Sequence, residues 1–135
     1  MNRFLDERPV EGLRSGGVIL GLISNILLAT KMVQTAKLCH VTIRLSDKAE
    51  TLLAQAKQNV PVLVLVDWDT CESEAFKLLK EFLRASDLNS VPVIGYLSQE
   101  KIHLKDEIRR AGCHRVYGKS EFQRDLPNLF ARYAQ

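Results

Sequence analysis

Apolar, strand-like segments alternate five times with helix-like segments along this chain of 135 residues. Each strand-like segment is a short apolar run, and the stretch after it repeats its apolar residues at helical spacing. The expected strands cover 18–24, 41–45, 62–69, 91–97 and 115–118. The expected helices cover 25–39, 47–58, 72–86 and 100–112, and a last one carries Leu126, Leu129, Phe130 and Tyr133. This order predicts an α/β fold in which helices cover both faces of a parallel sheet.

Particular residues predict where these helices begin and end. Asn25 and Ser46 stand where N-caps of the first two helices are expected. Gly112 is expected to close the fourth helix, and Pro127 to lie near the first turn of the last one.

Helical spacing also predicts the buried faces of two helices. In the first helix the expected core-facing residues are Ile26, Met32, Val33 and Ala36. In the third they are Ala75, Leu78, Leu79, Phe82 and Leu83.

Composition favours one soluble globular domain, which we place at 17–135 after a loose N-terminal arm at 1–16. The apolar run 18–29 is too short to span a bilayer, so no membrane association is expected. The net charge is +3 and basic residues are interleaved with acids, so nothing here requires nucleic acid. The C-terminal basic residues favour a solvated helix face slightly over a surface for an acidic partner; they are Lys105, Arg109, Arg110, Arg115 and Arg124.

The cysteines and histidines indicate neither a disulfide framework nor a metal centre. The three cysteines are widely separated and odd in number, which favours a reducing, cytoplasmic setting. Cys71 lies just past the acidic segment and is expected to be a small structural residue. The histidines have no metal-ligand spacing; they are His40, His103 and His114.

The longest apolar run ends on Asp67-Trp68-Asp69. In open parallel sheets, functional groups gather at the carboxyl ends of the strands. A carboxylate there can attack phosphorus or bind a hard cation, and Lys119, after the fifth strand, could supply a positive charge. The alternative is structural: the two acids cap the helix beginning near Glu72, and Lys119 pairs with a nearby acid. Trp68 is expected at the rim of this site, partly buried.

On these residues, the chain from 18 to 134 resembles the CheY-like receiver domain of bacterial response regulators. The matches include Val91-Pro92-Val93 opening the fourth strand and Ala111-Gly112 ending the fourth helix. The resemblance implies a five-stranded flavodoxin-like sheet in the order 2-1-3-4-5. It also implies that Asp67 is the phosphoacceptor and that Lys119 contacts the phosphate.

Several positions depart from the receiver pattern. Receivers carry an acid pair at the end of the first strand, where this chain has Ile23 and Ser24, so only Asp67 and Asp69 remain as weak Mg²⁺ ligands. The switch hydroxyl position is Leu97, although Ser98 is adjacent, and the proline expected after Lys119 is Ser120. The switch aromatic position is Val116, with Tyr117 beside it and expected to face the other side of the sheet.

Three functions follow as hypotheses. The first is an atypical receiver, not a metabolic enzyme, that signals by binding a histidine kinase or a downstream protein. The family's contact face, formed by the fourth helix, fifth strand and fifth helix, is also a candidate homodimer interface. The second is a working phospho-receiver of a phosphorelay. The third, a flavodoxin-like enzyme or nucleotide binder, is weaker because no glycine-rich loop follows the first strand.

Overall fold

The computed structural model describes residues 17–133, and the expected arm at 1–16 lies outside this range. Five parallel strands form one sheet in the order β2-β1-β3-β4-β5. They are β1 (Val18–Leu22), β2 (Thr42–Ser46), β3 (Leu63–Asp67), β4 (Val93–Leu97) and β5 (Arg115–Gly118). The predicted fold class and strand order are confirmed.

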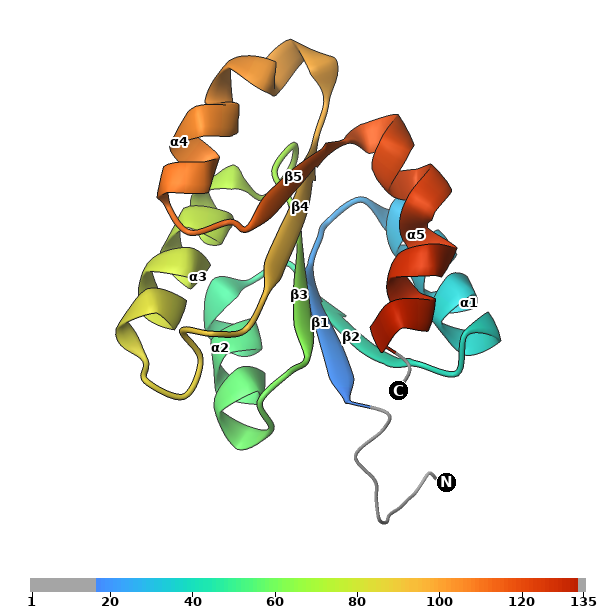
Figure 1. Ribbon diagram of the computed structural model, residues 1–135, viewed down its shortest axis with the longest axis horizontal. Coiled ribbons are helices and arrows are strands. Elements are labelled where there is room, and N and C mark those ends of the chain that lie inside the picture. The colour runs from blue at the N-terminus through green and yellow to red at the C-terminus, as the bar shows by residue number, and fades with distance from the viewer. Residues whose placement is uncertain (1–16, 134–135) are drawn as a thin grey trace.

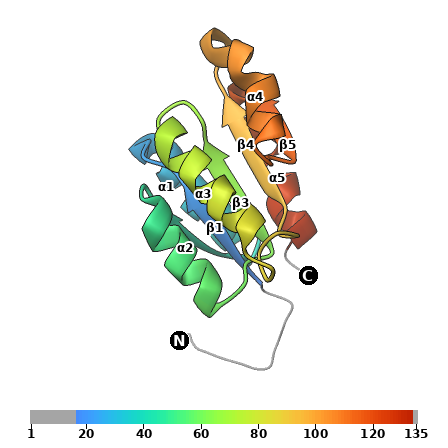
Figure 2. The same cartoon turned by 90° about the vertical axis from the view of Figure 1, so that its left-hand side faces the viewer.

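Helices cover both faces of the sheet. They are α1 (Ile26–Leu38), α2 (Ala49–Gln58), α3 (Glu72–Arg84), α4 (Lys105–Arg110) and α5 (Lys119–Tyr133). Figure 1 shows α1 and α5 on one face and α2, α3 and α4 on the other, and Figure 2 shows the layers from the side. No helix in the described part of the chain is both long enough and apolar enough to span a bilayer.

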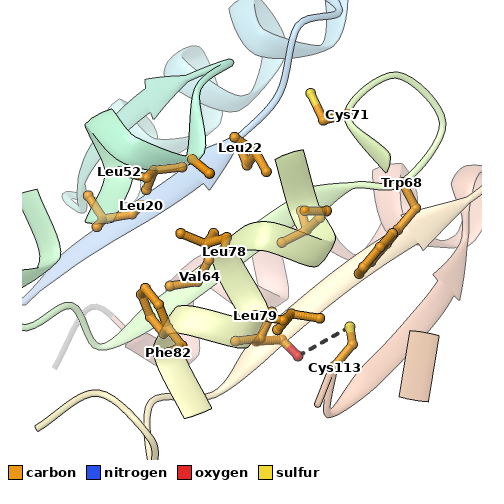
Figure 3. Close-up of a cluster of buried hydrophobic side chains, with 14 of the residues drawn as sticks. Leu20, Leu22, Leu52, Val64, Trp68, Cys71, Leu78, Leu79, Phe82 and Cys113 are labelled. Carbon is orange, nitrogen blue, oxygen red and sulfur yellow. Dashed lines mark hydrogen bonds between the residues drawn. The ribbon is translucent and has the colours of Figure 1, made fainter. Parts of the chain in front are cut away.

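The sheet separates two hydrophobic cores. Under α2, α3 and α4, side chains of β1 and β3 such as Leu20 and Val64 meet Leu52 of α2 and Leu78 of α3 (Figure 3). Under α1 and α5, alternate strand residues pack against Phe122 and other apolar side chains of α5. All residues of β3 and β4 are buried, which explains why their sequences are apolar without alternation.

Two predicted helix faces need correction. In α1, Met32 and Ala36 are buried as expected, but Ile26 is 79% exposed and Val33 lies at the surface. Leu28 takes the predicted place of Ile26, because the buried stripe of α1 runs through 28, 32 and 36. In α3, Leu83 is 53% exposed while the other four predicted residues are buried.

The N-caps of the first two helices differ in outcome. Asn25 caps α1, where its Oδ1 accepts a hydrogen bond from the backbone N of Leu28 at 3.1 Å. Ser46 is not the N-cap of α2: the helix begins later, and Lys48 occupies the cap position without a side-chain bond. The Ser46 hydroxyl instead accepts from the backbone N of Lys48 at 3.1 Å, and the first free N–H of α2, that of Ala49, donates to Glu74 of α3 at 2.8 Å.

The last two predicted helices also have different limits. The expected helix 100–112 divides into a 3₁₀ segment, η1 (Gln99–Leu104), and the short α4. Only Leu104 of η1 packs on the core, so this segment lacks the apolar stripe that would fix an α-helical turn. Gly112 follows α4 with φ of 115°, as a helix-terminating glycine does. Because α5 begins already at Lys119, Pro127 lies inside that helix and not near its first turn.

Candidate functional site

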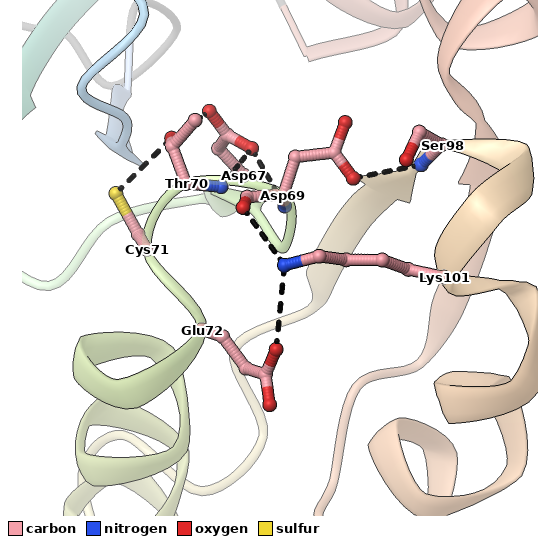
Figure 4. A network of polar contacts seen from close by, with 7 residues as sticks. All are labelled: Asp67, Asp69, Thr70, Cys71, Glu72, Ser98 and Lys101. Atoms are coloured by element: carbon pink, nitrogen blue, oxygen red, sulfur yellow. Dashed lines mark hydrogen bonds and ion pairs between the residues drawn. The ribbon is translucent and has the colours of Figure 1, made fainter.

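Asp67 ends β3 and is 1% exposed. Its Oδ1 accepts hydrogen bonds from the backbone N of Asp69 at 2.9 Å and of Thr70 at 3.1 Å, while its Oδ2 accepts from the Thr70 hydroxyl (Figure 4). Its carbonyl oxygen also accepts from the N of Cys71 at 3.1 Å. A carboxylate that binds N–H groups two and three residues ahead stabilises a tight turn. Both oxygens of Asp67 are therefore engaged by residues of its own loop, which we call the acid turn (67–70).

The proposed structural alternative for Asp67 and Asp69 needs revision. The N-cap of α3 is Cys71, which forms no side-chain cap bond, so neither acid caps the helix. Asp67 stabilises the turn that precedes the helix, and Asp69 accepts a hydrogen bond from Ser98, the residue after β4.

Asp69 connects the acid turn to the segment after β4. Its Oδ1 accepts from the backbone N of Ser98 at 2.8 Å. The ammonium of Lys101, on η1, donates to the carbonyl oxygen of Asp69 at 3.0 Å and lies 3.5 Å from the Glu72 carboxylate (Figure 4). The side chains of Lys101 and Glu72 are 36% and 41% exposed, so this ion pair is screened by solvent. These three bonds tie two neighbouring strand ends together.

Sequence reasoning missed Lys101. The only signal was a lysine three residues after Ser98, in a segment predicted as ordinary helix. The position faces the acid turn because η1 is a 3₁₀ segment with three residues per turn, in which the N of Lys101 donates to the carbonyl of Ser98 at 3.0 Å.

Lys119, the lysine expected at this site, is the first residue of α5 and is partly exposed. Within residues 17–133, no hydrogen bond or ion pair joins it to Asp67. The two expected catalytic residues thus lie at the carboxyl ends of β3 and β5, with β4 between these strands, and no hydrogen bond or ion pair in the described part of the chain joins them.

The expected switch positions lie in three environments. Leu97 and Val116 are buried in the core under α2, α3 and α4. Tyr117 packs on the opposite face, as predicted, with the Arg115 guanidinium 4.3 Å from its ring centroid. Ser98 is partly buried, and its backbone N contacts the acid turn.

Tyr96 is a site residue that sequence reasoning did not consider. It is the register neighbour of Asp67 in β4, is 1% exposed, and packs its ring 4.9 Å from that of Phe122 in α5. Its hydroxyl is buried without a hydrogen-bond partner in the described chain. Burial first, and then the negative charge of Asp67, raise the pKa of Tyr96 well above its usual range. The phenol therefore stays neutral beside the carboxylate.

Trp68 does not lie at a rim: its side chain is fully buried. The indole packs edge-on against Phe76 with ring centroids 4.9 Å apart, and it covers Gly95 of β4 so closely that a Cβ there would clash with the ring. Its Nε1 is buried without a hydrogen-bond partner in the described chain. Trp68 therefore anchors the acid turn to the core.

The donor set at this edge does not fit a Mg²⁺ site. Ile23, at the end of β1, is buried and apolar, and the side-chain oxygen of Asn25 is engaged as a helix cap. Both oxygens of Asp67 accept from the acid turn, and Asp69 accepts from Ser98. In residues 17–133, no three His, Cys, Asp or Glu side chains gather as metal ligands would. A hard cation needs several oxygen ligands, and at this edge both Asp67 oxygens and one Asp69 oxygen already accept hydrogen bonds.

Cys71 lies directly after the acid turn, and Cys113 lies two residues before β5. Cys71 and Cys113 are buried and free, and burial raises the pKa of both thiols. The thiolate is the reactive form, so a raised pKa is typical of a structural cysteine. This agrees with the expected structural role of Cys71.

The fold is similar to several solved structures. One is a response regulator from Hahella chejuensis, with TM-score 0.75 and 15% identity over 87% of this chain and 94% of that one. Another is the receiver domain of a sensor histidine kinase from Pseudomonas aeruginosa with a magnesium ion in its active site cleft, with TM-score 0.74 and 15% identity over 88% and 98%. A third is the chemotaxis response regulator CheY4 of Vibrio cholerae, with TM-score 0.71 and 14% identity over 87% and 98%.

No protein-family model matches the chain, and no curated protein matches it. At these identities the structural similarity establishes the fold, which is the CheY-like receiver fold.

Proposed function

We propose that this chain is an atypical receiver domain that transmits signals by protein–protein contact, with weak or no Mg²⁺-dependent phosphorylation of Asp67. One observation carries the proposal: the Asp67 carboxylate is buried and both of its oxygens accept hydrogen bonds from the acid turn. A carboxylate with both oxygens engaged in this way stabilises the loop that follows it. To accept a phosphoryl group it would first have to release those bonds.

The chemistry of phosphoryl transfer supports the same conclusion. The transferred group carries charge that metal ions and cationic side chains must neutralise. At this edge Ile23 is apolar, the Asp67 oxygens accept hydrogen bonds from the acid turn, and within residues 17–133 Lys119 forms no hydrogen bond or ion pair with Asp67. Neutralisation by a metal ion and neutralisation by a lysine would both lower the barrier to phosphoryl transfer, and both are therefore reduced here.

The partner is a protein of a signalling pathway, either a histidine kinase or a downstream component. We assign the contact to the face formed by α4, β5 and α5, which is also the candidate face for a homodimer. It exposes basic side chains on neighbouring elements, including Arg109 and Arg110 of α4, Arg115 of β5 and Arg124 of α5. An acidic surface on the partner would complement this charge.

A second candidate, a phospho-receiver that uses Asp67, rests on a separate observation. A lysine and a hydroxyl-bearing residue, Lys101 and Ser98, lie beside the acid turn. These are the residue types that a phosphorylated aspartate needs nearby, although both come from the segment after β4.

Amide NMR spectra of the full chain, recorded with and without Mg²⁺ and beryllofluoride, separate the two candidates. We expect no shifts centred on Asp67, since beryllofluoride binds a carboxylate as a phosphate mimic only where a metal completes the site. Fluoride alone and Mg²⁺ alone serve as controls. Saturable shifts at Asp67 that spread to residues 97–120 would establish the phospho-receiver and overturn the proposal.

A further inference from the structure

A polar cleft lies on the sheet face covered by α2, away from the acid turn. It has a volume of about 340 Å³ and is lined by Val18, Leu20, Arg44, Gln55, Gln58 and Asn59. Its apolar floor comes from the first half of β1, its cation from β2, and its amides from the C-terminal half of α2 and its cap. Sites for small molecules usually occupy about 300–1,000 Å³. The cleft is thus large enough for a metabolite of modest size.

One wall of the cleft presents a cation. Arg44 pairs with Leu20 in the register of β1 and β2, so both side chains lie on the same face of the sheet. The Arg44 side chain is exposed, and within residues 17–133 it forms no ion pair. A guanidinium binds a carboxylate through two parallel hydrogen bonds.

The opposite wall presents acceptors. The carbonyl of Gln55 accepts the last capping bond of α2, from the N of Asn59 at 3.0 Å, so the carbonyls that follow it end the helix without helical partners. This helix end also carries the negative pole of the helix dipole.

Gln55 would add a second acceptor to this wall once its side-chain amide rotates. Its Oε1 is buried and has no hydrogen-bond partner in the described chain, which is unfavourable for an amide oxygen. Rotation of the amide would turn this oxygen toward a donor that enters the cleft.

We propose that this cleft binds a small polar zwitterion of the α-amino acid class. Its carboxylate pairs with Arg44, and its ammonium donates to Gln55 and to the carbonyl end of α2. The exposed amides of Gln58 and Asn59 contact the polar side chain of the ligand. This binding is independent of phosphorylation at Asp67, which lies at the carboxyl ends of the strands, so either proposal can fail without the other.

The test uses the full chain labelled with ¹⁵N and three matched probes. L-Glutamine carries both charged ends, 4-carbamoylbutanoate lacks the ammonium, and 4-aminobutanamide lacks the carboxylate. We expect saturable shifts centred on the cleft residues. L-Glutamine should bind about tenfold or more tightly than either analogue, since each charged end adds a charge-assisted bond.

Two variants assign the ends of the ligand. Arg44→Gln should abolish the advantage of L-glutamine over 4-aminobutanamide, and Gln55→Leu should reduce its advantage over 4-carbamoylbutanoate, because the carbonyl end of α2 still accepts from the ammonium. Both positions tolerate change without loss of the fold, because Arg44 is exposed and Gln55→Leu removes an unpaired polar group. Lys57→Gln makes the same charge change as Arg44→Gln on an exposed residue outside the cleft, and should leave binding unchanged.

Three results would overturn the proposal. Equal affinity for the three probes would show contact without recognition of either end. Absence of any saturable shift at the cleft would show no binding. Nuclear Overhauser contacts between residues 1–16 and Arg44 or Gln55 in the ligand-free chain would assign the cleft to the chain's own N-terminal segment.

Discussion

The two sides of Asp67 differ in how firmly they are connected. Toward β4 and η1, the acid turn is held by Ser98 and Lys101 and by the buried indole of Trp68. Toward β5 and α5, Lys119 forms no hydrogen bond or ion pair with the acid within residues 17–133. The two lysines are equivalent in charge, and only one contacts the acid turn. A position at the end of a strand therefore does not by itself make a lysine a partner of Asp67. The hydrogen bonds that the surrounding residues form decide whether the Asp67 carboxylate is free to react.

Removing the acid itself should have the largest effect. Asp67→Ala leaves two backbone N–H groups and the Thr70 hydroxyl without their acceptor, so we expect a loss of about 3 kcal/mol in the free energy of unfolding. Urea denaturation measures it. Asp67→Asn keeps one acceptor oxygen and should lose clearly less. Equal, negligible losses in both variants would mean that the carboxylate does not stabilise the turn.

A methyl group added beneath Trp68 tests how tightly the indole packs the acid turn against the core. Gly95→Ala places a Cβ against the indole, which is fully buried and cannot move away without displacing Phe76. Overpacking of this kind should lower the free energy of unfolding by about 2 kcal/mol. Gly118→Ala is the matched control, because a Cβ at that glycine meets no other atom within 4 Å. A Gly95→Ala variant as stable as wild type would show that Trp68 is not tightly packed there.

Matched substitutions of Asp69 and Lys119 measure how much each side of Asp67 contributes to the free energy of unfolding. Asp69→Ala removes the acceptor of the Ser98 N–H and should cost about 1 kcal/mol. Lys119→Ala should change stability by less than about 0.5 kcal/mol, as expected of a partly exposed residue that forms no ion pair within residues 17–133. Thermal and urea unfolding measure both. A larger loss of stability in Lys119→Ala than in Asp69→Ala would show that the β5 and α5 side is the more firmly connected one.

Lys101→Met tests the screened ion pair and should have a smaller effect than Asp69→Ala. It removes the bonds to Asp69 and Glu72 but keeps most of the aliphatic stem, so a loss of about 0.5 kcal/mol is expected. The loss should shrink at high salt, because exposed charges are screened. A loss that is unchanged by salt would place the contribution in packing.

The smallest effect concerns acid pH at the junction of α2 and α3. Hydrogen bonds from the Ala49 N–H and the Lys77 ammonium lower the pKa of Glu74 below its usual 4.5. A lowered folded pKa stabilises the fold above pH 4.5, and this stabilisation is lost as pH falls through the folded value. Glu74→Gln should therefore flatten the decline of stability between about pH 5 and pH 3. Identical pH profiles for wild type and variant would contradict this.

The period of the apolar residues predicted the sheet, its helices and the opposite facing of Val116 and Tyr117. It could not predict which face of α1 is buried, because Ile26 and Val33 are apolar yet exposed. It also could not predict that η1 is a 3₁₀ segment, since only Leu104 of this segment packs on the core and no apolar stripe fixes an α-helical turn there.

At the site, the resemblance to receivers singled out Asp67 as a candidate and named the positions around it that depart from the receiver pattern. The resemblance could not predict the hydrogen bonds inside the acid turn, because they depend on the rotamer of Asp67 and on the backbone path of the next three residues. The burial of Trp68 had a signal in the sequence that was not used: Gly95, on the adjacent strand, leaves room for a large side chain.

The position of Trp68 also has an optical consequence. It is the one tryptophan of the chain, and it is fully buried immediately after Asp67. Its fluorescence therefore comes from the acid turn alone, with the short-wavelength emission of an indole shielded from water. Any ligand, partner or substitution that opens this turn would shift the emission to longer wavelength, so the native chain reports on its own site without a label.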